Sequence, residues 1–218
     1  MRALLHLATL AIIAGLGFAQ APPKASELVE RALDFYSKVT TASFTQTITS
    51  GTVKMKFAVS GELPDKMRLE MDDTTARLTD FGENTGGVIV IGNGTKQFTR
   101  FLGPNTYRVL QLETEASRMR DMLPPFGLAF DIEKSRYLPD EVIDAAPCYV
   151  LELVERKPPG EPQTYRWWIE QSTEKVIRAE RLGGNSTSLV TFENLHLNEQ
   201  LPPETFVFKP SPGSRQIE

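Results

Sequence analysis

Residue types that could carry out catalysis are few in this chain and stand apart from one another. The 218 residues include one cysteine, Cys148, and two histidines, His6 and His196. Acid–base and nucleophilic catalysis need a nucleophile, an acid or a metal beside a group that titrates near neutral pH. Cys148 lacks a Cys-x-x-Cys partner, and His196 lies between two leucines on an expected strand. The sequence therefore predicts no catalytic centre, no metal and no cofactor. An enzyme that combines His196 with acids is the alternative.

Two acidic pairs and one Gly-x-Gly motif also lack the context that catalysis or phosphate binding requires. Asp72-Asp73 and Asp140-Glu141 are adjacent in sequence, and adjacent side chains of a strand point to opposite faces. The stretch 92–94, Gly-Asn-Gly, lacks the strand-loop-helix context and the glycine-lysine pair of a phosphate-binding loop, so a hairpin turn is the better interpretation. The net charge of -4 gives no basic surface for nucleic acid.

The chemistry that the sequence favours is the binding of apolar groups. Methionine and aromatic side chains gather at expected inward strand positions and in one expected helical insertion. Methionine is flexible and polarizable, so it suits a surface that accepts varied apolar ligands. A plain hydrophobic core is the other interpretation of these residues. We expect the following side chains to line a cavity and its lid: Met55, Phe57, Met67, Leu69, Met71, Phe98, Met119, Met122, Phe126 and Phe130.

One helix and about ten short strands are expected to position these side chains. Residues 24–38 repeat apolar side chains at helical spacing, and Ser26 is in place to cap the helix. Beyond it the apolar period changes to two, which is typical of half-buried antiparallel strands. Many short strands joined by short turns imply one sheet that is strongly curled or closed. The strands are expected at 52–60, 67–72, 76–81, 88–91, 96–102, 106–110, 148–156, 164–170, 175–182 and 186–198.

A long insertion without the strand pattern interrupts this series at residues 113–144. Residues 113–123 predict a helix that ends at Pro124-Pro125, and a dense apolar patch follows at 126–130. A second short helical turn is expected near 138–143. The insertion fits a lid or plug over the sheet; a helix that only covers the core is the alternative.

The first 21 residues have the pattern of an export signal. Met1-Arg2 supplies a positive start, and an uncharged apolar run follows at residues 3–18. Ala19-Gln20-Ala21 has the small-x-small pattern of a signal-peptidase site. The run is shorter than the roughly 20 residues that span a bilayer; an uncleaved anchor is the alternative. We expect cleavage after Ala21, one domain over residues 22–218, and a periplasmic location.

Several segments, taken in order, resemble the LolA superfamily of periplasmic lipoprotein carriers. The stretch 42–46, Ala-Ser-Phe-Thr-Gln, is similar to the first strand of that family, after an opening helix. The stretches 61–71 and 88–98 are similar to its next strand pair and hairpin. Residues 201–213, Leu-Pro-Pro-Glu-Thr-Phe-Val-Phe-Lys-Pro-Ser-Pro-Gly, are similar to its closing element.

The resemblance implies an α+β fold, in which one curled antiparallel sheet of about 10–11 strands forms an unclosed β-barrel with an N-terminal helix and a helical lid. It implies a soluble, monomeric carrier that holds the acyl chains of lipoproteins or other lipids. Such a carrier would have an inner-membrane donor and an outer-membrane acceptor as partners, and no nucleic acid. A single-domain sensor or interaction module on the same scaffold is the alternative function.

Overall fold

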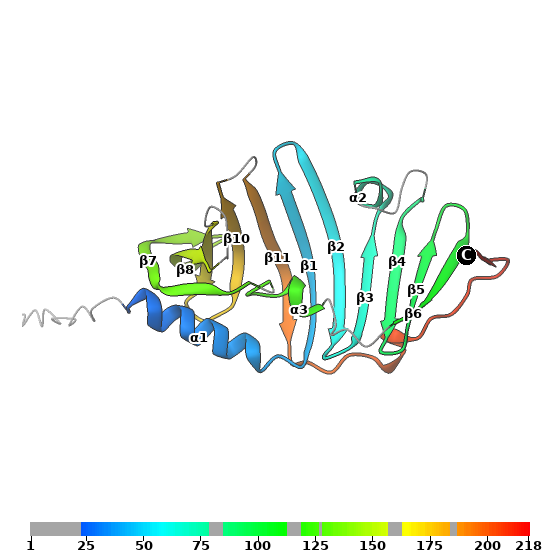
Figure 1. Cartoon of the computed structure of the whole chain (residues 1–218), viewed down its shortest axis with the longest axis horizontal. Helices are drawn as coiled ribbons and strands as arrows, with labels where there is room; N and C mark the ends of the chain where they lie inside the picture. Colours follow the sequence, from blue (N-terminus) through cyan, green and yellow to red (C-terminus); the bar gives the residue numbers. More distant parts are fainter. Residues whose placement is uncertain (1–22, 79–84, 113–118, 127, 157–162, 184–186) are drawn as a thin grey trace, which may run out of the picture.

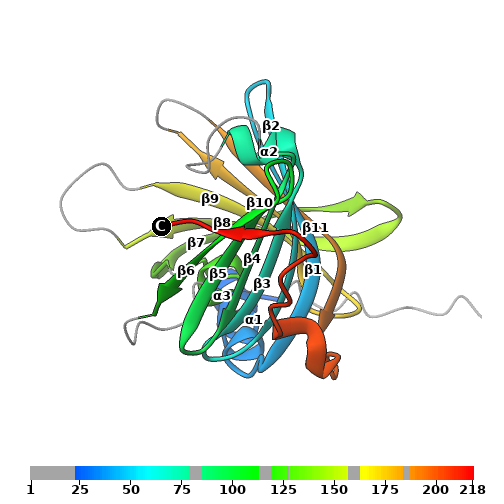
Figure 2. The ribbon, with the colours of Figure 1, turned by 90° about the vertical axis from the view of Figure 1, so that its right-hand side faces the viewer.

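One curled, unclosed sheet dominates the molecule (Figures 1 and 2). The computed structural model describes residues 23–78, 85–112, 119–126, 128–156, 163–183 and 187–218, without the side chains of Met119 and Arg120. The strand order is β12-β6-β5-β4-β3-β2-β1-β11-β10-β9-β8-β7. All neighbours are antiparallel except β12 and β6. The elements are α1 (Ala25–Ser37), β1 (Thr41–Ser50), β2 (Val53–Glu62), β3 (Lys66–Met71), α2 (Asp73–Arg77), β4 (Val88–Asn93), β5 (Lys96–Phe101), β6 (Thr106–Gln111), α3 (Met119–Met122), β7 (Phe130–Ile143), β8 (Ala146–Glu155), β9 (Thr164–Glu170), β10 (Val176–Leu182), β11 (Ser188–Leu197), η1 (Pro203–Phe206) and β12 (Arg215–Gln216).

The expected unclosed barrel is confirmed, and its strands form because alternate side chains have a common apolar face to join. In β2, Phe57 and Val59 are buried, while Lys56 and Ala58, which alternate with them, are exposed. Pairing then carries this face across the sheet, because directly opposite residues point the same way. We call the side that carries these residues, α1 and α3 the inner face, and the opposite side the outer face. Trp167 and Trp168, adjacent on β9, are buried on the inner and outer faces respectively.

Helix α1 lies across the half of the sheet formed by β7 to β11 (Figure 1). It begins after Lys24, which makes no side-chain cap bond. The expected cap at Ser26 is therefore wrong, because Ser26 already lies inside the first turn. The apolar stripe of the helix is buried, and Tyr36 closes it: its hydroxyl accepts a hydrogen bond of 2.9 Å from the backbone N–H of Val176. Burial raises the pKa of Tyr36 well above its usual range.

The strand expected at 76–81 is wrong, because the helix α2 replaces its start. The carboxylate of Asp72 accepts a hydrogen bond of 2.7 Å from the backbone N–H of Thr75 and so caps this helix. The hydroxyl of Thr75 accepts in turn from the backbone N–H of Lys56, at 2.9 Å, which ties α2 to β2. A short polar stretch that starts with a good N-cap favours a turn of helix over an edge strand. Residues 79–81 lie outside the described part.

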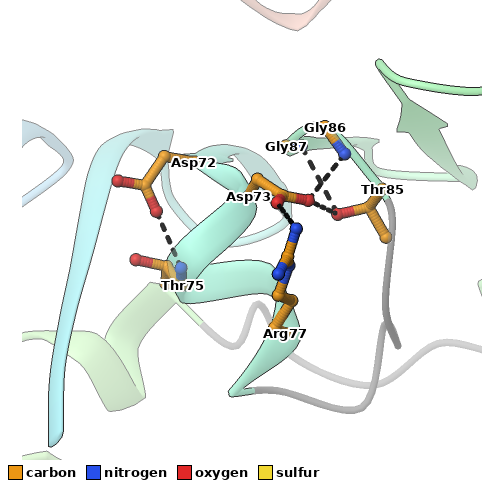
Figure 3. A network of polar contacts seen from close by, with 7 residues as sticks. All are labelled: Asp72, Asp73, Thr75, Arg77, Thr85, Gly86 and Gly87. Atoms are coloured by element: carbon orange, nitrogen blue, oxygen red, sulfur yellow. Dashed lines mark hydrogen bonds and ion pairs between the residues drawn. The ribbon is translucent and has the colours of Figure 1, made fainter.

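A polar network around Asp73 joins α2 to the start of β4 (Figure 3). One carboxylate oxygen of Asp73 accepts hydrogen bonds from the backbone N–H of Gly86 at 2.8 Å and from the hydroxyl of Thr85 at 3.3 Å. The other oxygen pairs with Arg77. The bond from Gly86, and next the Arg77 side chain, hold the pKa of Asp73 below its usual range. Asp72 and Asp73 thus serve two separate structural contacts.

The helical turn expected near residues 138–143 is also wrong. These residues belong to β7, which spans Phe130–Ile143 at one edge of the sheet. Its pairing with β8 shifts between Asp131 and Arg136 and again between Leu138 and Glu141. Each bulge inverts the side-chain alternation, so the apolar positions show no period of two. The non-strand insertion therefore ends before Phe130, and residues 113–118 lie outside the described part.

The segment after β11 returns across the sheet to its far edge. Phe206, in η1, is buried, and the ring of Phe208 stacks on Phe98 with centroids 4.7 Å apart. The segment then places β12 parallel to β6. Figure 2 shows this segment in red, crossing in front of β3 to β6. It covers part of the outer face.

Replacing Gly86 with alanine tests the junction between α2 and β4. Gly86 has a φ of +63°, and a Cβ there would lie 2.7 Å from backbone atoms of Gly103. We expect Gly86→Ala to lower the free energy of unfolding by about 1 kcal/mol for the left-handed backbone and about 1–3 kcal/mol more for overpacking. Gly51→Ala is the matched control, because Gly51 has a φ of +57° and nothing within 4 Å. Urea unfolding measures both; equal losses would contradict the crowding at Gly86.

Candidate functional site

The inner face is a continuous apolar surface built from most strands of the sheet. On β1 to β3 the register places Gln46 opposite Phe57, and Phe57 opposite Met71. On the other side, Gln46 pairs with Phe192 of β11. Helix α1 buries one half of this surface. The other covering element is the α3 segment, which we define as residues 119–126 with Leu128.

The α3 segment lies over β11 and β1 (Figure 1) and is held by apolar side chains, among them the buried Leu123 and the ring of Phe126, and by a side-chain hydrogen bond from Gln46. The ring of Phe126 stacks on Phe192, with centroids 6.0 Å apart, and meets Trp167 edge to face at 6.5 Å. The amide Nε2 of Gln46 donates a hydrogen bond of 3.2 Å to the backbone carbonyl of Met122. Gln46 is only 3% exposed, so a buried polar group on β1 is satisfied by the segment above it.

A cavity of about 370 Å³ lies between the α3 segment and the inner face. Its volume falls in the range of pockets that hold small ligands, about 300–1,000 Å³. Carbon-rich side chains dominate its wall, and charged side chains lie at its mouth. It is lined by Gln46, Ile48, Phe57, Asp121, Met122, Phe126, Leu128, Tyr165, Ala179, Glu180, Arg181, Ser188 and Val190.

A larger hollow, of about 650 Å³, lies elsewhere, between the C-terminal segment and the sheet. Its wall includes Glu62, Lys66 and Asn93 beside Phe98 and Phe206, so it mixes charged, amide and aromatic groups. Size alone would favour this hollow. We favour the smaller cavity as the binding site, because its lining is predominantly apolar and it lies under a short segment.

The chemically reactive residues are occupied in structural contacts. His196 is exposed and its Nδ1 lies 3.0 Å from a carboxylate oxygen of Glu199. The thiol of Cys148 is buried and donates a hydrogen bond to the carbonyl of Ala146 at 3.3 Å; burial raises its pKa. Within the described ranges, no three His, Cys, Asp or Glu side chains come together as a metal site. In the same ranges, no helix has the length and apolar character to cross a membrane.

Most of the predicted cavity residues do share the inner face, but few of them line the cavity. Phe57, Met122 and Phe126 line it. Phe98 is not brought together with the others: it pairs with Ile91 on the outer face and stacks on Phe208. The side chain of Met119 lies outside the description. Eight of the ten predicted cavity and lid residues belong to the apolar core on the inner face: Met55, Phe57, Met67, Leu69, Met71, Met122, Phe126 and Phe130.

Several residues that line the cavity were not predicted from the sequence. Ile48 and Val190 lie opposite each other on β1 and β11, and the alternation of Phe44, Gln46 and Ile48 would have indicated the first of them. Gln46 carries no such signal, because its partner, the carbonyl of Met122, is 76 residues away in sequence.

Comparison with known proteins finds related folds and little sequence identity. No protein-family profile matches the chain. An uncharacterized protein of Methanocaldococcus jannaschii is 23% identical over 175 residues, which are 78% of this chain. The chain spans about half of that relative, 46% of its length. Among solved structures, the lipoprotein LppX of Mycobacterium tuberculosis matches with a TM-score of 0.51 and 12% identity, over 82% of this chain and 97% of its own. LprF of Mycobacterium bovis matches with a TM-score of 0.52 and 10% identity, over 82% of this chain and 95% of the LprF chain.

These likenesses show the fold. The unclosed barrel with one N-terminal helix is the fold that the sequence resemblance implies, and that expectation of the fold is confirmed.

Replacing Gln46 tests whether its hydrogen bond holds the α3 segment over the cavity. Gln46→Leu leaves the Met122 carbonyl without this partner, so we expect hydrogen exchange at the amide of Phe126, which bonds the Leu123 carbonyl at 2.6 Å, to accelerate about tenfold or more, the equivalent of about 1.4 kcal/mol. Gln97→Leu is the control, because the Gln97 amide contacts Thr99 within the sheet. Unchanged exchange in the Gln46 variant would show that the segment is held by its apolar contacts alone.

Proposed function

We propose that this protein binds the acyl chains of lipoproteins or other lipids in the cavity beneath the α3 segment and carries them. The observation on which this rests is the cavity of about 370 Å³ with apolar walls on the inner face of an unclosed sheet. An apolar cavity wall offers few groups for catalysis, but it favours the transfer of a hydrocarbon chain from water. Each methylene group transferred from water into such a site contributes about 0.8 kcal/mol.

The construction of the site supports uptake and release without an energy source on this chain. The α3 helix has four residues, too short to be stable by itself. Its segment is positioned by the bond from Gln46 and by four apolar side chains that pack on the inner face: Met122, Leu123, Phe126 and Leu128. Displacing these few contacts would open the cavity along β1 and β11. A ligand chain would replace the apolar contacts that the opening removes.

The cellular setting of the proposal follows from the sequence. The export signal at residues 1–21 would take the protein into the periplasm, where an acyl chain in transit needs cover from water. One protein that shares the fold, LppX, is itself described as a lipoprotein. Carriage between an inner-membrane donor and an outer-membrane acceptor is the transport role that we propose for this chain.

Filling the cavity should abolish lipid binding. Val190 lines the cavity, whereas its neighbour Leu189 points to the other face of the same strand, opposite Glu180. We expect Val190→Trp to weaken the binding of a fluorescent long-chain fatty acid at least tenfold, because the loss of two buried methylene groups, about 1.6 kcal/mol, is already more than that. Leu189→Trp should bind as the unchanged protein does.

The two variants are compared by fluorescence titration, after circular dichroism has shown that both are folded. Equal affinity of the two variants would place the ligand elsewhere. Failure of the unchanged protein to bind any long-chain lipid would contradict the proposed function itself.

A further inference from the structure

Polarity changes in steps along the strands that form the cavity wall. The first row across the sheet is polar and consists of Tyr165, Arg181 and Ser188, which lie directly opposite one another on β9, β10 and β11. Two residues further along each strand, the row is apolar: Trp167, Ala179, Val190 and Ile48. Phe192, two residues beyond Val190 on β11, is also apolar, and its ring stacks on that of Phe126. The cavity therefore has one polar end and one apolar end.

Arg181 is the cationic group of the polar end. It is exposed and lines the cavity, and among the described residues it makes no ion pair. Arg166, on the outer face, differs, since it pairs with Glu180 at 3.6 Å. The charge of Arg181 acts on Tyr165 in the cavity wall. Burial, and next Glu155, raise the pKa of Tyr165, and the positive charge of Arg181 opposes that rise. The hydroxyl of Ser188, opposite Arg181, adds a hydrogen-bond donor to the same end.

Asp121 faces this end from the other wall. It belongs to α3, is exposed, and lines the same cavity. No ion pair joins it to Arg181 among the described residues, so the two charges stand apart across the mouth. The carboxylate of Glu180 is not part of this end, because Glu180 lies opposite Arg166 and Leu189 on the outer face and pairs with Arg166 there. Within the described ranges, Arg181 on the sheet and Asp121 on the segment that covers it are thus a cation and a carboxylate of this cavity without an ion-pair partner.

We propose that the cavity takes an amphiphile with an anionic head, a carboxylate or a phosphate, which Arg181 and Ser188 bind at the mouth. This inference rests on the proposed function and adds the chemistry and the orientation of the ligand. The acyl chain enters tail first, passes Ala179, Val190 and Ile48, and ends against Phe126 and Phe192. Arginine suits the head because its fork of donors matches both a carboxylate and a phosphate.

Asp121 gives the site a second property. Its carboxylate repels an anionic head, so it weakens binding while the α3 segment is closed over the mouth. Removing that charge strengthens the binding of anionic amphiphiles and leaves neutral ones unchanged. The two charges on opposite walls therefore predict opposite effects of two substitutions at one site.

The test compares three probes of equal chain length: palmitate, palmitoyl lysophosphatidate and the neutral hexadecanol. Arg181→Gln should weaken binding of the two anionic probes about tenfold or more, with no change for hexadecanol. Asp121→Asn should strengthen binding of the anionic probes severalfold. Arg178→Gln is the control, because Arg178 lies on the same strand but stacks on Trp168 on the outer face, 4.4 Å from the ring centroid.

The outcomes separate the two proposals. Binding of all three probes with no effect of Arg181→Gln overturns the head-group site and leaves the apolar cavity standing. Absence of binding for every probe overturns the proposed function. If only palmitate or only lysophosphatidate responds to Arg181→Gln, the head-group site is supported and its ligand is assigned to that class.

Discussion

An unclosed sheet has an apolar inner face that its own strands cannot cover, and the rest of this structure follows from that constraint. A closed barrel would bury the face against itself. Here β12 and β7 are the two ends of the sheet order, so helices and short segments must cover what closure would have buried. Helix α1 supplies a large cover over one half, and the α3 segment supplies a small one near β1 and β11.

The two covers are held in different ways, and the binding site that we propose rests on this difference. The hydroxyl of Tyr36 locks α1 to β10, and Arg31 pairs with Glu174 at 3.3 Å beside it. The α3 segment has one helical turn and is held by a few apolar side chains, including Phe126 and the buried Leu123, and by the bond from Gln46. One half of the inner face is therefore a permanent core. We propose that the other half is a core that a ligand opens and completes.

Much of the fold could be predicted from the sequence, because alternation survives wherever a strand pairs without interruption. Phe57 and Val59 revealed β2 in this way. The same rule failed at β7, where bulges break the alternation, and at α2, where Asp72 caps a helix that propensity alone does not favour.

The site was harder to predict than the fold, because a cavity is defined by contacts between distant segments. In β5, Phe98 and Phe101 have opposite parity, so one strand alone cannot show which of them faces inward. The register does: Phe98 lies opposite Ile91, on the outer face, whereas Phe101 lies opposite Val88 and inward. Gln46 and the polar row at Arg181 were missed for the same reason, since their roles appear only when the α3 segment is placed over the sheet.

The central claim is that the inner cavity holds a hydrocarbon chain, and native mass spectrometry of the protein purified from the cells that naturally make it tests this claim most directly. The account predicts a reproducible mass increment that corresponds to a lipid or an acylated protein, and its loss in the Val190→Trp variant made by the same cells. A protein that is consistently free of lipid, or that carries the same lipid in that variant, would contradict it.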